Sequence, residues 1–74
     1  DSIVEADELA AAIVSFLKTL SQTKRIVFIH RYWYCRSIAE IAELSGFSQS
    51  KIRTMLMRVR NELKKHLERQ GYVL

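Results

Sequence analysis

Apolar residues recur along the chain at intervals of three and four, which is the spacing of one face of an α-helix. The pattern predicts four helices, over residues 4–20, 22–34, 38–45 and 49–69. The 74 residues contain no proline and only two glycines, Gly46 and Gly71, so the frequent turns of a many-stranded sheet are missing. We therefore expect a single all-α domain, residues 1–74, built from four helices with short connections.

Each of the first two predicted helices carries an apolar stripe that we expect to face the core. In the first helix the stripe consists of Leu9, Ile13, Phe16, Leu17 and Leu20. In the second it consists of Ile26, Ile29 and Trp33, and Val27 and Phe28 widen it. Ser21 precedes the second helix, where a hydroxyl can cap the free amides of the first turn.

The third and fourth predicted helices have recognisable ends. Ser37, followed three residues later by Glu40, fits a capping box at the start of the third helix. Gly46 can adopt the left-handed conformation that ends a helix and turns the chain, and Ser48 can cap the next helix. A short capped helix, a glycine turn and a second helix form a helix-turn-helix, whose second helix enters the major groove of DNA.

The predicted fourth helix separates its side chains by type. At about 100° per residue, one face gathers Ile52, Leu56, Val59, Leu63 and Leu67, and we expect this face in the core. The opposite face carries Ser50, Arg53, Thr54 and Met57. From that face Arg53 can make a bidentate contact with guanine, worth about 1–3 kcal/mol of discrimination. Along the edges, Lys51, Arg58 and Arg60 are placed for backbone phosphates.

Charge supports a polyanionic partner. Residues 1–20 hold four carboxylates and one lysine, a net charge of −3. Because the whole chain carries +4, the remaining residues carry +7.

The longest apolar run, residues 9–14, is too short to span a bilayer, and no signal peptide is visible, so no membrane role is expected. The chain begins with Asp1 rather than Met, which suggests a fragment of a longer protein.

No pattern of catalytic or metal-binding residues stands out. Paired carboxylates, a nucleophile with its base, and a phosphate-cradling glycine loop are all missing, so we expect no enzyme, no cofactor and no metal. His30 and His66 are far apart in the sequence. The lone Cys35 cannot form an internal disulfide, which favours a cytoplasmic protein; it is a turn residue or a redox sensor.

Three stretches of the chain resemble a known family. They are residues 25–33, residues 37–48 with Glu-Ile-Ala and the glycine turn, and residues 51–60 with the closing Arg-x-Arg-x-x-Leu that ends at Leu63. Together they resemble region 4 of bacterial sigma-70 family factors, most nearly the extracytoplasmic-function type, over about residues 9–67.

The resemblance implies the C-terminal domain of a sigma factor, which binds the −35 element of double-stranded promoter DNA and directs RNA polymerase to initiate. It also implies docking on the flap of the polymerase β subunit and masking by an anti-sigma factor. By position, base reading falls on Gln49, Ser50, Arg53 and Thr54. Phosphate contacts fall on Arg31, Ser37, Lys51 and Arg58.

The chain departs from the usual family pattern at four positions. Ser21 replaces a common proline, Cys35 a glycine, Met55 a basic residue and His30 an aliphatic one. Ser21 can cap a helix and Met55 can pack, and the fold is expected to tolerate these two changes and Cys35. The change to Cys35 bears on the turn before Ser37. Without a cation at Met55, one phosphate contact of the family is expected to be absent.

Two other functions fit the same residues. One is a free-standing transcriptional regulator of the response-regulator type, which would need a separate sigma factor for initiation. The residues 58–63 and the aromatic run 32–34 favour the sigma interpretation over this one. The other is a protein-interaction module whose basic face binds an acidic protein; it would show no salt-dependent binding to DNA.

Overall fold

The computed structural model describes residues 2–72, and their side chains from residue 7 onward, so the expected bounds of 1–74 extend beyond the described residues. Residues 2–72 form four helices and no strand: α1 (Ser2–Thr19), α2 (Gln22–Tyr32), α3 (Ile38–Ser45) and α4 (Gln49–Arg69). The prediction of an all-α fold is confirmed, and α3 and α4 have the predicted bounds. α1 begins two residues earlier than predicted, and α2 ends two residues earlier.

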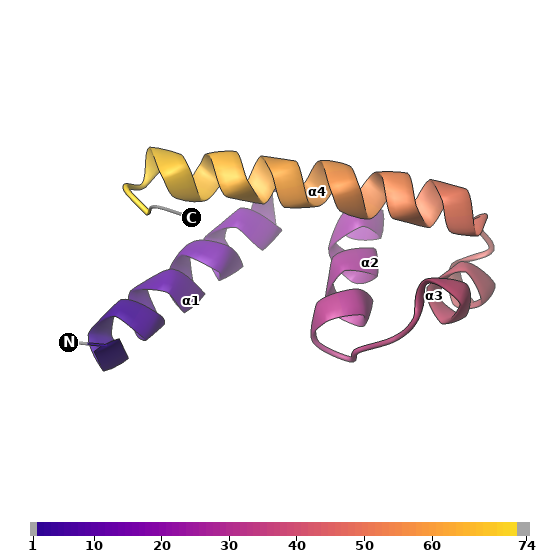
Figure 1. Ribbon diagram of the computed structural model, residues 1–74, viewed down its shortest axis with the longest axis horizontal. Helices are drawn as coiled ribbons and strands as arrows, with labels where there is room; N and C mark the ends of the chain where they lie inside the picture. The colour runs from indigo at the N-terminus through magenta and orange to yellow at the C-terminus, as the bar shows by residue number, and fades with distance from the viewer. Residues whose placement is uncertain (1, 73–74) are drawn as a thin grey trace.

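The long helix α4 is the element on which the other three helices pack. α1, α2 and α3 all pack on it, α3 near its N-terminal end and α1 beside its C-terminal half (Figure 1). α2 stands between them and also contacts α3. The domain is elongated, with extents of 41 × 20 × 19 Å. Since three helices contact one side of α4, that side is buried and the other stays open to a partner.

Two clusters of buried apolar side chains hold the helices together. The cluster at the helix-turn-helix consists of Val27, Ile41, Ala42, Ile52 and Leu56. The cluster beside α1 consists of Phe16, Leu20, Phe28 and Val59. Both clusters contain neighbouring residues of α2 and residues from successive turns of α4, so they follow one another along α4. Burial of its Ile52, Leu56 and Val59 side chains fixes the rotation of α4 about its axis, as the predicted apolar face requires.

The predicted core face of α2 is wrong in part. Val27 and Phe28 are buried, whereas Ile26 is 46% exposed and Trp33 is 80% exposed. The reason lies in the packing of α2 on α3 and α4. Apolar residues lie around most of α2, so its sequence does not select one face, and burial of Val27 and Phe28 turns Ile26 outward. Trp33 follows the last helical residue as the C-cap, beyond the packed turns.

The helix ends follow the predicted signals. The hydroxyls of Ser21 and Ser48 accept hydrogen bonds from backbone amides of α2 and α4. Gly71 has a φ of 93° just beyond α4, and its amide donates to the Glu68 carbonyl. A further cap comes from Arg25, whose guanidinium donates to the carbonyls of Leu17 (3.1 Å) and Leu20 (3.0 Å) at the end of α1.

None of the four helices has the length and apolar content to cross a bilayer.

Candidate nucleic-acid interface

The helix-turn-helix of α3 and α4 is held by its caps. The Ser37 hydroxyl accepts from the Glu40 amide, and the Glu40 carboxylate accepts from the Ser37 amide, each at 3.0 Å, so the predicted capping box is confirmed. The amide hydrogen bond from Ser37 lowers the pKa of Glu40 below its usual 4.5, and the Ser37 hydroxyl and the nearby Arg36 charge act in the same direction. Gly46 ends α3 with a φ of 79°, the left-handed conformation that the motif requires.

The predicted base-reading residues lie in the first two turns of α4. Gln49, Ser50 and Arg53 are exposed, and Thr54 is half-buried. Arg53 donates from Nη2 to Oε1 of Gln49 at 3.3 Å, so the amide holds the guanidinium along the exposed face of the helix. A guanidinium and an amide side by side can each bind a base edge in the major groove, Arg53 preferring guanine and Gln49 adenine.

Beside this face lies a basic concavity of about 410 Å³. It is lined by Lys24, Ser48, Ser50, Lys51, Thr54, Met55 and Arg58. The structure thus brings together four of the predicted DNA-contacting residues, Ser50, Lys51, Thr54 and Arg58. Lys51 also lies over the Phe47 ring, with Nζ 4.1 Å from the ring centroid, a cation–π contact that orients the ammonium group.

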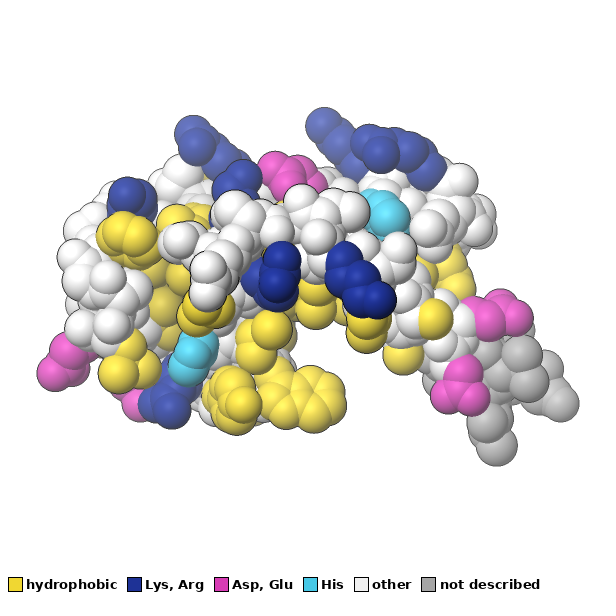
Figure 2. All heavy atoms as spheres, turned by 180° about the vertical axis from the view of Figure 1, so that it is seen from behind, with side chains coloured by type: hydrophobic (Ala, Val, Ile, Leu, Met, Phe, Trp, Pro, Cys, Tyr) yellow, Lys and Arg dark blue, Asp and Glu magenta, His cyan; other side chains and the backbone are white. Residues whose placement is uncertain are grey.

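Lysine and arginine side chains gather along the α4 side of the molecule, whereas apolar side chains gather toward the hollow beneath it (Figure 2). Three cations and three hydroxyls around the basic concavity provide the donors that bind a phosphate oxyanion. The predicted base-reading residues and part of the predicted phosphate-binding set therefore lie next to each other in the tertiary structure.

Lys24 is the residue of the basic concavity that sequence reasoning missed. It lies in the first turn of α2, outside the helix-turn-helix, and no motif or periodicity in the sequence singles it out. Its position beside α4 follows from the packing of α2 on α4. Only the three-dimensional arrangement could identify it.

The remaining predicted phosphate-binding residues lie outside the concavity. Arg31 is half-buried and donates from Nη1 to the Arg36 carbonyl at 2.9 Å, which stabilises the connection between α2 and α3. Ser37 uses its hydroxyl oxygen to cap α3, and its hydroxyl proton can still be donated to a phosphate. Arg60 is exposed and donates from Nη1 to the Tyr32 hydroxyl at 2.7 Å.

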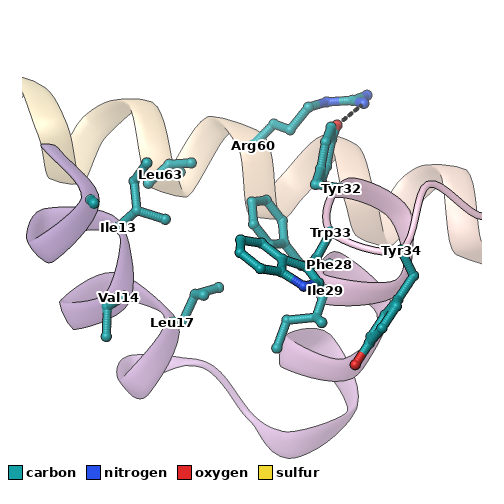
Figure 3. A pocket seen from close by; sticks show the side chains of 11 residues that line it. Ile13, Val14, Leu17, Phe28, Ile29, Tyr32, Trp33, Tyr34, Arg60 and Leu63 are labelled. Atoms are coloured by element: carbon teal, nitrogen blue, oxygen red, sulfur yellow. Dashed lines mark hydrogen bonds between the residues drawn. The ribbon is translucent and has the colours of Figure 1, made fainter. Parts of the chain in front are cut away.

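A second surface, an apolar groove of about 770 Å³, lies between α1, α2 and α4. It is lined by Ala10, Ile13, Val14, Leu17, Phe28, Ile29, Tyr32, Trp33, Tyr34, Arg60 and Leu63. Side chains of α1 face the Trp33 indole across the groove, and Arg60 lies at its rim over Tyr32 (Figure 3). Exposed aromatic and aliphatic groups in one concave surface are typical of a site that binds another protein.

The histidines and the cysteine have no metal-binding arrangement within the described residues, where no three His, Cys, Asp or Glu side chains cluster. His30 accepts a hydrogen bond at Nδ1 from Arg36, and the His66 ring packs against Phe16 with centroids 5.5 Å apart. Cys35 is exposed in the connection between α2 and α3. None of these three residues lines the basic concavity.

Comparison with known protein families identifies a match. The family model described as sigma-70, region 4, matches residues 10–63, which is most of the chain. The match includes all of α2 and α3 and the part of α4 that carries the predicted DNA contacts. No curated protein and no solved structure matches the chain significantly.

Proposed function

Since the chain belongs to the sigma-70 region 4 family, whose members are DNA-binding and not enzymatic, we propose that it reads the −35 element of promoters with the exposed face of α4. The observation that carries the proposal is the placement of Arg53 and Gln49 on that face, directly beside the basic concavity. Base recognition and a large part of the phosphate binding are then supplied by adjacent residues of α4. Contact with promoter DNA in turn recruits polymerase for initiation.

We assign the individual residues the roles that the family resemblance and their places on the helices suggest. Base edges are read by Gln49, Ser50, Arg53 and Thr54. Backbone phosphates are bound by Arg31, Ser37, Lys51, Arg58 and Arg60. Arg60 already uses one of its five N–H donors on the Tyr32 hydroxyl, so its contribution to affinity is expected to be smaller than that of Lys51. Such a domain acts where promoters and polymerase are, in the cytoplasm, as the lone cysteine also favours.

The test compares two substitutions on a panel of duplexes that differ at single −35 positions. Arg53→Ala should reduce discrimination at one position by about 1–3 kcal/mol, because a bidentate base contact is lost. Lys51→Ala should weaken all duplexes about equally and lower the slope of log Kd against log salt by about one. Fluorescence anisotropy at several salt concentrations measures both effects.

An unchanged sequence preference in Arg53→Ala would contradict the assignment of base reading. Wild-type protein without salt-dependent duplex binding would contradict the DNA function as a whole and favour the protein-interaction module. A response-regulator-type activity would appear as initiation that still requires a separate sigma factor in a reconstituted transcription assay.

The apolar groove supports a second part of the proposal, the contact with RNA polymerase. Members of the family bind polymerase as well as DNA, and we propose that the flap of the β subunit docks in the groove through apolar side chains. The groove is lined mostly by apolar groups and shares no lining residue with the basic concavity; of the proposed DNA-binding residues, only Arg60 borders it. An anti-sigma factor would have to cover one of these two surfaces to silence the domain.

A further inference from the structure

Lys24 faces the basic concavity from a different helix than the other cations. Its side chain lines the concavity from α2, whereas Lys51 and Arg58 line it from α4. Three positive charges around one concavity repel one another, and an anion bound among them stabilises all three. The hydroxyls of Ser50 and Thr54 add neutral donors to the same space.

A carboxylate already competes for Lys24. Its Nζ lies 3.9 Å from Oε1 of Glu62, one turn beyond Arg58 on α4, and the two side chains are 40% and 48% exposed. A pair this long and this exposed contributes little to stability, because water screens it. Lys24 can therefore exchange the carboxylate for a phosphate at little cost.

We propose that Lys24 is an additional DNA-binding residue, which contacts a backbone phosphate of the duplex together with Lys51 and Arg58. We further infer that Glu62 lowers DNA affinity by competing with that phosphate for the Lys24 ammonium. Because Lys24 stands on α2 and not on the recognition helix, its contact adds affinity for every sequence and discriminates none. This inference rests on the proposed promoter-binding function.

The experiment measures duplex affinity against salt for the wild-type chain, Lys24→Met, Glu62→Gln and the double variant. Methionine keeps a long apolar side chain at the half-buried position 24 but removes the charge. Lys24→Met should lower the salt slope by about one and weaken binding about three- to tenfold at 0.1 M salt, equally on all sequences. In the protein that keeps Lys24, Glu62→Gln should tighten duplex binding about two- to threefold. In the double variant, which lacks the lysine, this gain should vanish.

Lys18→Met is the matched control, since Lys18 is an exposed lysine of α1 that does not line the basic concavity. It should leave the slope at the wild-type value, and circular dichroism should show that all variants are folded. An unchanged slope in Lys24→Met, or an equal fall in Lys18→Met, would overturn the phosphate contact. An equal gain from Glu62→Gln with and without Lys24 would overturn the competition.

The two proposals fail in different ways. Wild-type protein that does not bind duplex DNA in a salt-dependent manner would overturn the promoter-binding function and this inference together. Wild-type binding that is steeply salt-dependent, with Lys24→Met indistinguishable from it, would overturn this inference alone.

Discussion

At the scale of single residues, Cys35 carries backbone strain. Its φ is 56°, the left-handed region, and within residues 2–72 the other positive φ angles belong to glycines. For a residue with a Cβ this conformation costs about 1–2 kcal/mol. The strain lies where the connection between α2 and α3 reverses direction, at the position that is commonly glycine in the family.

Cys35→Gly should therefore stabilise the domain, by about 1 kcal/mol once the greater freedom of glycine in the unfolded chain is subtracted. Urea unfolding of the two proteins measures the difference. Cys35→Ala is the control, since it removes the thiol but keeps the Cβ, and its stability should stay near that of the wild type. A stabilisation of equal size in Cys35→Ala would show that the thiol, and not the backbone angle, is responsible.

Glu40 makes the capping box sensitive to acid. Its pKa in the folded state lies below the usual 4.5, chiefly because the carboxylate accepts the Ser37 amide hydrogen bond. A carboxyl group whose pKa is lowered on folding stabilises the protein above its unfolded-state pKa, and this contribution is lost as pH falls through the folded-state pKa. Wild type should thus be more stable than Glu40→Gln at neutral pH.

The difference between wild type and Glu40→Gln should shrink as the pH falls below about 4.5. Taking the difference cancels the other carboxylates, which titrate in both proteins. Thermal unfolding between pH 3 and 7 provides the measurement. A difference that stays constant over this range would mean that the charge of Glu40 does not stabilise the cap.

At the scale of elements, the turn between α3 and α4 determines how the recognition helix is presented. Gly46 ends α3 in the left-handed conformation, and a Cβ built there would have no atom within 4 Å. The requirement for glycine is therefore conformational and not steric. A left-handed angle is tolerated by asparagine better than by other side chains, and least by β-branched ones.

Gly46→Val should accordingly lower the free energy of unfolding by about 1–2 kcal/mol or more, whereas Gly46→Asn should lose less. In a domain this small, 1 kcal/mol shifts the melting temperature by about 4–8 °C. Calorimetry of the two variants beside wild type tests the order. Equal losses in both variants would point to crowding at the turn and contradict the conformational explanation.

The elements also show what local sequence determines. The caps by Ser37 and Ser48 and the turn at Gly46 were predictable, because each depends on residues within four positions along the chain. The bounds of α3 and α4 follow from these signals. The inward face of α4 was predictable as well, because its apolar residues occupy one side only. α2 lacks such a division, and there the prediction of Trp33 in the core was wrong.

At the scale of the whole molecule, α4 borders two different surfaces. Its N-terminal half carries the predicted base-reading residues and the basic concavity, while Arg60 and Leu63 border the apolar groove with α1 and α2. A substitution in the groove should thus affect polymerase binding and leave DNA binding intact.

Trp33→Gln is the sharpest test of this separation. The Trp33 side chain is 80% exposed, so its replacement should change stability by less than about 0.5 kcal/mol. Binding to RNA polymerase should weaken at least about tenfold, because exposed tryptophans in grooves are frequent anchors of interfaces. Affinity for duplex DNA should stay at the wild-type value.

Leu44→Gln is the matched control, since Leu44 is 64% exposed and does not line the groove. It should keep wild-type binding to both partners. Polymerase binding by Trp33→Gln at wild-type strength would contradict docking in the groove.

The sequence by itself determined the helices, their caps, the glycine turn and the side of α4 that faces away from the core. These features depend on side chains within one or two turns of each other, and their physical causes act locally. Candidate DNA contacts on α4, such as Arg53 and Lys51, could be named for the same reason.

Tertiary structure decided what depends on the packing of one helix on another. It placed Lys24 of α2 beside Arg58 of α4, joined Arg60 to Tyr32 across 28 positions of sequence, and left Trp33 exposed in a groove. Periodicity gives the direction of a side chain only relative to its own helix axis. The rotation of α2 against α4 is set by the burial of Val27 and Phe28 in the shared core, and that choice depends on all four helices together.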